Sequence, residues 1–381
     1  MIRERSALRK GRLRPVRILV RARGCFRRIS ALLGVGVFGV AVMMFARETP
    51  EPAQAAAITS VSPSRGSIAG GTTVTLNASQ FFPAWRAAGY EMVEYLTFTG
   101  SQYINTGVNQ IGDTKVELDF QMTTLVDPNI SLFGSRNGAW NNSSFSLAKL
   151  GSNDAGGVNS RNYFCARYGT TSTAETPNRS VSVYPQFRDT LRHKWVQDNG
   201  TTWWSTDGGA LAQPTQPTGS RTAPGTGYSM FVGAINNSGS PFYSDGTPTH
   251  NTRVYSLKIW KTSSLTRDFI PVRNLSTNAY GLWDKQNSVF YPATAGTLSG
   301  GPDILLNFSV DIGGAPCNIT SVTGTQITCT TTTHTAGSAN VTVSESLTGE
   351  TWNLSSGYEY ALDVTNISPV IGQTGGGQTV T

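Results

Sequence analysis

Two carboxylates are spaced so that one strand would carry both on the same face. Glu117 and Asp119 lie two residues apart in Val116–Gln121, a segment that alternates apolar and polar residues. Because alternate residues of a strand share a face, the two side chains would point in the same direction. A retaining glycosidase needs such a pair, with one carboxylate as nucleophile and the other as acid/base. The alternative is that Glu117 and Asp119 belong to a solvated strand face.

Aromatic residues among polar, Gly and Asn neighbours form a second group of candidates. Exposed rings can stack on the apolar faces of sugars, while nearby Asn or Asp side chains hydrogen-bond the hydroxyls. The alternative is that half or more of these rings belong to the core. Trp203 and Trp204 are adjacent on an expected strand and must face opposite sides, so one of them should lie outside the core. The candidates for ligand binding are Trp203, Trp204, Trp283, Trp140 and Tyr184, with Tyr291 beside them.

The other reactive side chains do not form a metal-binding pattern. The histidines His193, His250 and His334 lie far apart, without the spacing of metal ligands. Several Asp residues lie near expected turns, where Asx turns explain them as well as calcium would: Asp127, Asp198, Asp207 and Asp245. We therefore expect no cofactor and assign no metal.

Charge locates an export segment and excludes polyanion binding. The net charge is +7, yet residues 1–30 alone contain eleven Lys or Arg and one Glu, and residues 52–381 sum to −2. Nucleic acid is therefore not an expected partner. The uncharged run Ala31–Ala46 and the small-residue stretch Ala53-Gln54-Ala55 follow the basic segment. This order predicts that residues 1–55 are a signal peptide, or else an uncleaved membrane anchor, with a hydrophobic export helix. Either way the remainder would lie outside the cytoplasm, at the cell surface or beyond.

The chain of 381 residues has room for two or three domains and contains an internal repeat. Ser62-Pro63 matches Ser368-Pro369, and Gly70-Gly71 matches Gly376-Gly377, each at an offset of 306. Val-Thr alternation after the glycines predicts a half-buried strand. These residues resemble the opening of the IPT/TIG domain, an immunoglobulin-like sandwich. The closing half of that family is similar to 310–329, 339–343 and 357–360.

The resemblance implies one split domain with a different domain inserted in it. The IPT/TIG parts would be residues 56–85 and 304–362, the insert residues 86–303, and residues 363–381 the start of a second, truncated repeat. Within the family pattern, Cys317 and Cys329 correspond to a pair that would form a disulfide. The alternative is that they remain a free buried pair. Cys165 has no evident partner. The alternative is a degenerate repeat followed by two unrelated modules.

The insert is expected to be entirely β. Apolar and polar residues alternate in Tyr95–Phe98, Val116–Gln121 and Arg253–Trp260, and Asn199-Gly200 predicts a hairpin. The insert resembles the laminin-G-like branch of the concanavalin A-like lectin/glucanase jelly roll. The segments that carry this resemblance are 95–107, 132–136, 192–195, 205–209, 231–239, 255–260, 267–274 and 281–301. The expected fold is thus a jelly roll nested in an Ig-like sandwich of an exported bacterial surface protein.

The resemblance also bears on catalysis. Glucanases of this fold carry a further Glu two or three residues beyond the E-x-D pair, where this chain has Gln121 and Met122. An amide cannot donate and retrieve the proton, so we expect no enzyme activity. The expected function is glycan binding or adhesion on an Ig-like stalk, with glycans or neighbouring cell-surface proteins as partners and membrane contact only through the N-terminal segment. The alternatives are a glycan hydrolase and a purely structural stalk.

Overall fold

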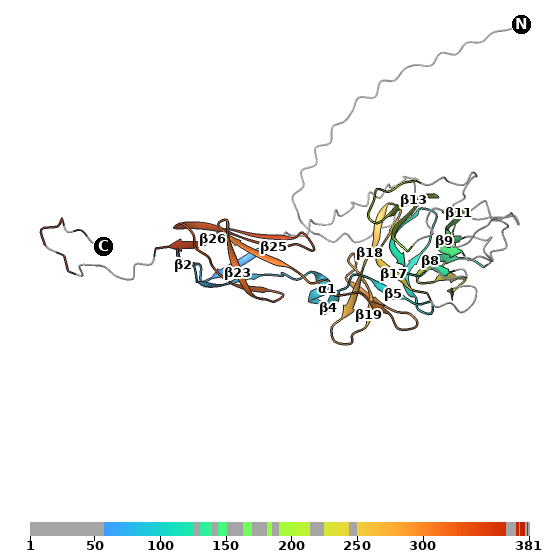
Figure 1. The fold of residues 1–381 in the computed structure, drawn as a ribbon, viewed down its shortest axis with the longest axis horizontal. Helices are drawn as coiled ribbons and strands as arrows, with labels where there is room; N and C mark the ends of the chain where they lie inside the picture. The colour runs from blue at the N-terminus through green and yellow to red at the C-terminus, as the bar shows by residue number, and fades with distance from the viewer. Residues whose placement is uncertain are drawn as a thin grey trace, which may run out of the picture. The chain divides into compact units, whose positions relative to one another are not determined.

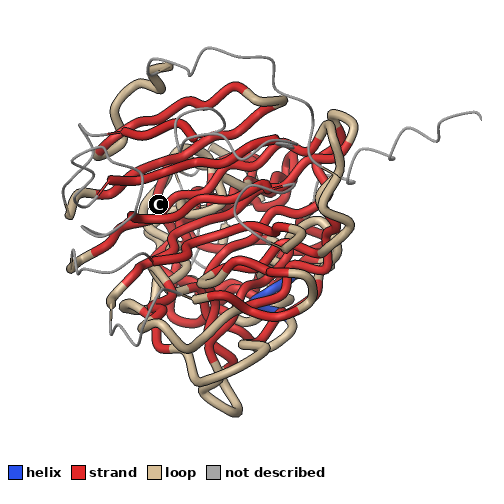
Figure 2. Tube along the Cα trace, turned by 90° about the vertical axis from the view of Figure 1, so that its right-hand side faces the viewer, coloured by secondary structure: helices blue, strands red, loops and turns tan. Residues whose placement is uncertain are grey.

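The computed structural model describes residues 57–124, 130–138, 144–150, 163–169, 181–184, 190–213, 225–243, 250–362, 371–372, 374–377 and 379. Within these ranges the protein is built from strands, with a single short helix, α1 (Ala84–Ala87) (Figures 1 and 2). No helix in the described ranges is long and apolar enough to cross a membrane. The all-β expectation is confirmed, whereas the predicted export helix lies outside the described residues.

Strands from the two ends of the described chain form one β-sandwich. Its order is β1-β3-β24-β23-β22-β25-β26-β2. The bounds are β1 (Ile58–Ser62), β2 (Arg65–Ser67), β3 (Thr73–Ala78), β22 (Phe308–Ile312), β23 (Ala315–Val322), β24 (Gln326–Thr330), β25 (Gly337–Glu345) and β26 (Thr351–Ala361).

The register of this sandwich joins residues about 250 positions apart in sequence. Leu76 of β3 pairs with Ile327 of β24, and Val74 pairs with Cys329. Alternate residues of β3 face inward, so Val74 and Leu76 are fully buried in the same core cluster as Ile312. Residues 58–78 and 308–361 therefore share one sheet path and one core.

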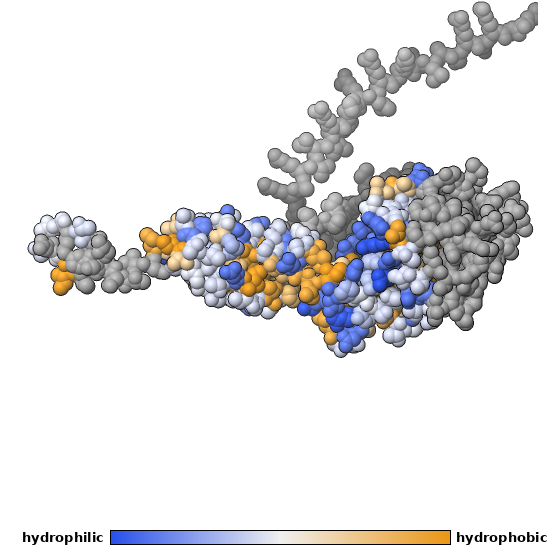
Figure 3. Space-filling model, viewed as in Figure 1, coloured by the Kyte–Doolittle hydropathy of each residue, from blue (hydrophilic) through white to orange (hydrophobic). Residues whose placement is uncertain are grey.

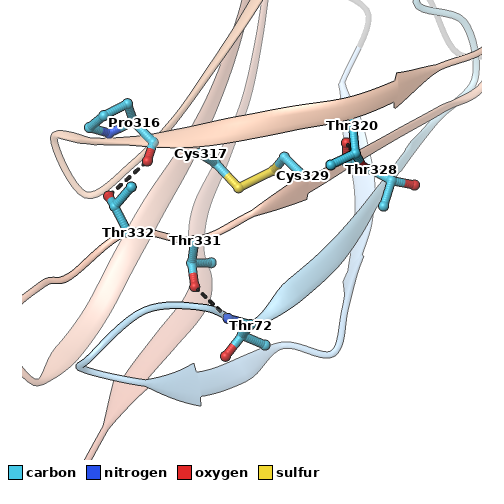
Figure 4. Close-up of a disulfide and its surroundings, with 8 residues drawn as sticks. All are labelled: Thr72, Pro316, Cys317, Thr320, Thr328, Cys329, Thr331 and Thr332. Atoms are coloured by element: carbon cyan, nitrogen blue, oxygen red, sulfur yellow. Dashed lines mark hydrogen bonds between the residues drawn. A yellow bond between two sulfur atoms is a disulfide. The ribbon is translucent and has the colours of Figure 1, made fainter.

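A disulfide links β23 to β24 within residues 308–361, and hydrogen bonds between threonines beside it join this segment to residues 58–78. Cys317 and Cys329 are joined, with Cα atoms 5.5 Å apart, as the family resemblance implies. Beside the disulfide, the amide of Thr72 donates to Oγ1 of Thr331 at 3.1 Å, and the amide of Thr331 donates to the carbonyl of Thr72 at 2.9 Å (Figure 4). The Thr332 hydroxyl donates to the carbonyl of Pro316 at 2.8 Å.

The residues between these halves form two further sheets. The larger contains β4 (Tyr90–Met92), β5 (Leu96–Phe98), β7 (Thr114–Met122), β12 (Arg192–Asp198), β13 (Thr201–Thr206), β17 (Thr252–Lys261), β18 (Ser264–Asn274), β19 (Tyr280–Asp284), β20 (Val289–Pro292) and β21 (Ser299–Gly300). Its main path runs β13-β12-β7-β17-β18-β19-β20. The second contains β6 (Ile104–Asn109), β8 (Ile130–Arg136), β9 (Ser144–Leu150), β10 (Tyr163–Gly169), β11 (Val181–Tyr184), β14 (Ser229–Val232), β15 (Ile235–Asn237) and β16 (Ser240–Phe242).

A large apolar core is shared between these two sheets. Strand β7 supplies it with Val116, Leu118 and Phe120, and the second sheet adds Phe133 and Phe145. The intervening residues of β7 are only partly buried, which is the alternation that the sequence predicts. One face of the larger sheet thus faces this core. Its opposite face, which we call the outer face, carries Glu117 and Asp119.

The predicted hairpin at Asn199-Gly200 is present. Both residues have positive φ, 42° and 80°, as a two-residue primed turn requires. The turn sets the register of β12 and β13, in which Trp195 pairs with Trp204. This register determines which of the adjacent tryptophans enters the core.

Candidate functional site: a tryptophan-lined hollow and a polar sheet face

Trp204 lies in the core between the two sheets and lines neither of the hollows described below. It is 1% exposed, contacts Phe120 edge-on at 5.9 Å between ring centroids, and donates through Nε1 to Nδ1 of His193 at 3.0 Å. Its assignment as a ligand-binding residue is therefore corrected. The physical reason is the hairpin register, which turns Trp204 inward and leaves Trp203, partly buried, on the outer face.

Two other candidates lie wholly or partly outside the residues that the structure describes. Trp140 lies outside the described residues. The backbone of Tyr184 belongs to β11, where it pairs with Phe164, but its side chain lies outside the description. Tyr291 packs edge-on against Phe269 at 5.1 Å and takes part in the core contacts of the larger sheet. Neither Trp140 nor Tyr184 gains support from the geometry.

Trp283 lies on the outer face and lines a hollow of about 830 Å³. Its indole is 4% exposed, and its Nε1–H has no hydrogen-bond acceptor. A buried donor without an acceptor costs roughly 1–3 kcal/mol. We call this space the tryptophan hollow; it is lined by Ser79, Gln80, Phe82, Pro83, Ala84, Trp85, Met92, Ile270, Trp283, Lys285, Leu347, Thr348, Glu350, Thr351 and Trp352.

Helix α1 supplies one side of the tryptophan hollow. Pro83 precedes the helix with φ −56° and ψ 157°, a conformation suited to the residue before a first helical turn. The single turn places Trp85, 3% exposed, in a small apolar cluster with Ile270, Val272 and Trp283. In Figure 3, hydrophobic surface gathers where Figure 1 places α1 and β4. Sequence reasoning missed Trp85, although the aromatic run Phe81-Phe82-Pro83-Ala84-Trp85 signals a packed segment.

The sandwich formed by residues 58–78 and 308–361 supplies the opposite side of the tryptophan hollow. Trp352 of β26 is 1% exposed and donates through Nε1 to the carbonyl of Gln80 at 3.1 Å. The loop before β26 adds Leu347, Thr348 and Glu350. Partial burial, together with the nearby charge of Glu345, raises the pKa of Glu350. The tryptophan hollow therefore has walls from segments that are far apart in sequence.

Glu345 holds that loop in place and gives the sandwich a pH dependence. Burial alone would raise the pKa of Glu345, but hydrogen bonds from the amides of Leu347, Asn307 and Thr348 and from the Thr348 hydroxyl outweigh it and lower the pKa. A lowered folded-state pKa means that this stabilisation is present above the unfolded-state pKa and is lost as pH falls through the folded value.

We therefore expect Glu345→Gln to lower the free energy of unfolding at pH 7 by about 1–3 kcal/mol, since it removes the charged acceptor. Urea denaturation of both proteins from pH 7 to pH 3 measures this. The gap should shrink as pH falls, because the wild-type carboxylate becomes neutral. A gap independent of pH would contradict the assignment of the lost stability to the Glu345 charge.

The carboxylates of β7 share the outer face, as expected, but each is paired with a cation. Asp119 accepts two hydrogen bonds from Arg192, from Nε and Nη2, both at 2.8 Å. Glu117 pairs with Lys115 at 3.1 Å. Gln121, in the next position on this face, accepts from the Tyr255 hydroxyl at 2.7 Å and donates to the carbonyl of Thr190 at 2.7 Å.

Arginines stacked on tyrosines cover the rest of this polar region. The Arg192 guanidinium lies 3.8 Å from the ring centroid of Tyr255, and that of Arg253 lies 4.2 Å from the centroid of Tyr95. The hydrogen bond to Asp119, which outweighs burial, raises the pKa of Arg192. Burial raises the pKa of Tyr255. This network holds the side chains in fixed positions around a second hollow.

The second hollow, of about 510 Å³, is polar. It is lined by Asp119, Arg192, Lys194, Ser205, Asp207, Gly208, Gly209 and Leu211. Asp207 and Gly208 form its rim in a turn with positive φ, 49° and 73°. Asp207 also accepts a hydrogen bond from the amide of Arg192 at 3.2 Å. Its carboxylate thus bonds to the backbone, as that of a turn-forming Asp does.

Strand register places the two hollows on one row of the outer face. Paired residues of neighbouring strands point to the same face, about 4.8 Å apart per strand. Lys194 pairs with Asp119, Asp119 with Ser256, and Ile270 with Trp283. Ser256 is next to Leu257, which pairs with Phe269, so Ser256 lies opposite Ile270. On this row, Ser256 lies between Asp119 of the polar hollow and Ile270 of the tryptophan hollow.

The described histidines have structural surroundings. His193 is fully buried and contacts Trp204 and Thr206, and His250 lies 3.0 Å from the Thr252 hydroxyl. The ring of His334 stacks on Tyr360 at 4.5 Å. Within the described ranges no three His, Cys, Asp or Glu side chains are grouped as metal ligands are.

Comparison with known proteins identifies one part of the chain. Residues 58–78 and 308–361 define an immunoglobulin-like sandwich with the observed disulfide. Residues 305–360 match the family model of the IPT/TIG domain. No curated protein matches the chain. Among solved structures, the chain is similar to a candidate carbohydrate-binding protein from Bacteroides ovatus ATCC 8483. The TM-score is 0.35 at 10% identity, over 61% of this chain and 70% of that chain, so we infer no ligand from it.

Proposed function

We propose that this protein is an exported, non-catalytic surface protein that binds glycans in the tryptophan hollow. The observation that carries the proposal is Trp283, whose buried Nε1–H lacks an acceptor at the wall of a hollow that two further tryptophans line. Sugar rings combine apolar faces with hydroxyl acceptors, which is the combination these groups require. The basic and apolar segment within residues 1–55 supports export.

We further propose the domain organisation that the repeat implies. Residues 56–85 and 304–362 would form the split IPT/TIG domain, and residues 86–303 a laminin-G-like jelly roll inserted in it. Residues 363–381 would begin a second repeat. The pairing of β3 with β24 and the two packed sheets of the insert support this division.

The absence of catalysis is likewise part of the proposal. Arg192 and Lys115 each neutralise one of the two carboxylates on β7, and Gln121 occupies the next position of that face. A glucanase of this fold would need a further carboxylate beyond the pair, and an amide cannot donate and retrieve the proton. Release of reducing ends from mixed β-glucans, abolished by Glu117→Gln, would contradict this and favour a hydrolase.

Glycan binding is tested by replacing the Trp283 indole with a smaller aromatic ring that has no N–H donor. Trp283→Phe keeps an aromatic ring in the wall and should weaken binding about threefold to tenfold on a glycan array followed by calorimetry, the value of one hydrogen bond. Trp260→Phe is the matched control, since Trp260 is partly buried on β17 but lies outside the tryptophan hollow, and should change affinity less than twofold. A wild-type protein that binds no glycan would overturn the proposal and favour adhesion to proteins or a structural stalk.

A further inference from the structure

One wall of the tryptophan hollow belongs to the IPT/TIG sandwich. Leu347, Thr348, Glu350 and Thr351 line the hollow and fall within residues 305–360, the segment that matches the IPT/TIG family. They lie on the turn between β25 and β26 and on the first residue of β26. The opposite wall is formed by the outer face of the larger sheet. A ligand in this hollow would touch both walls.

Hydrogen bonds within the protein order the loop of the IPT/TIG wall. Glu345, 1% exposed, accepts from the amides of Asn307, Leu347 and Thr348 at 2.7–3.0 Å. Its own amide donates to the carbonyl of Glu350 at 2.9 Å, which closes the loop. A loop that is already ordered costs little entropy when it binds, so its side chains are suited to recognition.

We propose that the turn between β25 and β26 is part of the glycan site, so that the IPT/TIG domain is a wall of the site as well as a spacer. This inference rests on the glycan binding proposed above. Glu345 acts as a positioning residue, because it reaches the ligand only through the loop that it holds. Each domain alone would then present an incomplete site.

The charges at the rim indicate the class of glycan. Lys285 is neutralised by Asp268, whose carboxylate lies 2.9 Å from Nζ. Glu350 forms no ion pair within the described part of the chain, so the rim is acidic. Carboxylate oxygens accept hydrogen bonds from neighbouring hydroxyls and repel other carboxylates. The site therefore fits neutral hexose oligosaccharides and disfavours uronic acids.

The experiment uses the full chain and three probes: cellohexaose, laminarihexaose and hexagalacturonic acid. Thr351→Trp fills the hollow from the IPT/TIG side, and we expect it to weaken binding of the better neutral probe at least tenfold. Glu350→Gln, which replaces the carboxylate with an amide of similar shape, should weaken it about threefold to tenfold. Ser355→Trp is the matched control, because Ser355 is exposed on the same strand but outside the hollow, and should change affinity less than twofold.

The outcomes separate this inference from the proposed function. If Trp283→Phe weakens binding but Thr351→Trp and Glu350→Gln do not, the inference that the IPT/TIG domain contributes to the site is overturned. The proposal of glycan binding then still stands. If the wild type binds none of the three probes and no glycan on the array, both proposals fall. Tighter binding of hexagalacturonic acid would overturn the ligand class. Should thermal unfolding show that Thr351→Trp disturbs the fold, Glu350→Gln decides the question.

Discussion

Replacing Trp204 with alanine is expected to lower the free energy of unfolding by about 3–5 kcal/mol, the range for truncating a fully buried tryptophan. The side chain is 1% exposed and lies among Phe120, Phe164 and His193 at centroid distances of 5.1–5.9 Å. The substitution would leave a cavity between the two sheets of the insert and remove the indole donor to His193. Urea denaturation followed by far-ultraviolet circular dichroism measures the loss.

The neighbouring tryptophan is the internal control. Trp203 differs by one position, so its side chain faces away from the core and is only partly buried. Trp203→Ala should cost about 1 kcal/mol or less, the usual range for a substitution away from the core. Equal losses for the two variants would show that the hairpin register is wrong. With Trp204 in the core, a loss of ligand binding in Trp204→Ala reports unfolding of the surrounding sheets and not a lost ligand contact.

Much of the fold follows from local sequence patterns. The glycines and Val-Thr alternation before Leu76 predict a strand, and the paired Cys317 and Cys329 follow from the IPT/TIG pattern. Asn199-Gly200 supplies the positive φ that a tight hairpin requires, and its register follows directly. These features are encoded within a few residues, or repeated at a fixed offset, which is why one sequence reveals them.

The candidate site is less visible because it is assembled from distant segments. The hollow is formed only after three separate stretches of chain have packed together, and it brings together Trp85, Trp283 and Trp352. The spacing of these residues in the sequence does not predict this. Alternation predicted that Trp203 and Trp204 face opposite sides but not which one is buried, since the inward face depends on pairing with β7. The loop held by Glu345 depends on hydrogen bonds to Asn307, across 38 positions.

The disulfide carries the second large effect. Cys317 and Cys329 are 4% and 0% exposed and lie in the core of the IPT/TIG sandwich, with Val74 paired directly to Cys329. Their cross-link closes a loop with a sequence separation of 12, and this stabilises the fold by roughly 3 kcal/mol, mainly through the unfolded chain. The double variant Cys317→Ala and Cys329→Ala should therefore lose about that much, with a further cost for the small cavity left in the core.

A reducing agent separates the cross-link from the packing of the two side chains. Dithiothreitol should destabilise the wild type by about 3 kcal/mol in urea denaturation and leave the double variant unchanged, because only the wild type has this bond to lose. The sandwich holds residues 58–78 and 308–361 together, so its loss should also release the wall that carries Glu350 and Trp352. In reductant, glycan affinity and the folded fraction of the sandwich should then decrease over the same range of urea concentrations. A wild type that is indifferent to reductant would show that packing of the two sulfur-bearing side chains, and not the covalent bond, supplies the stability.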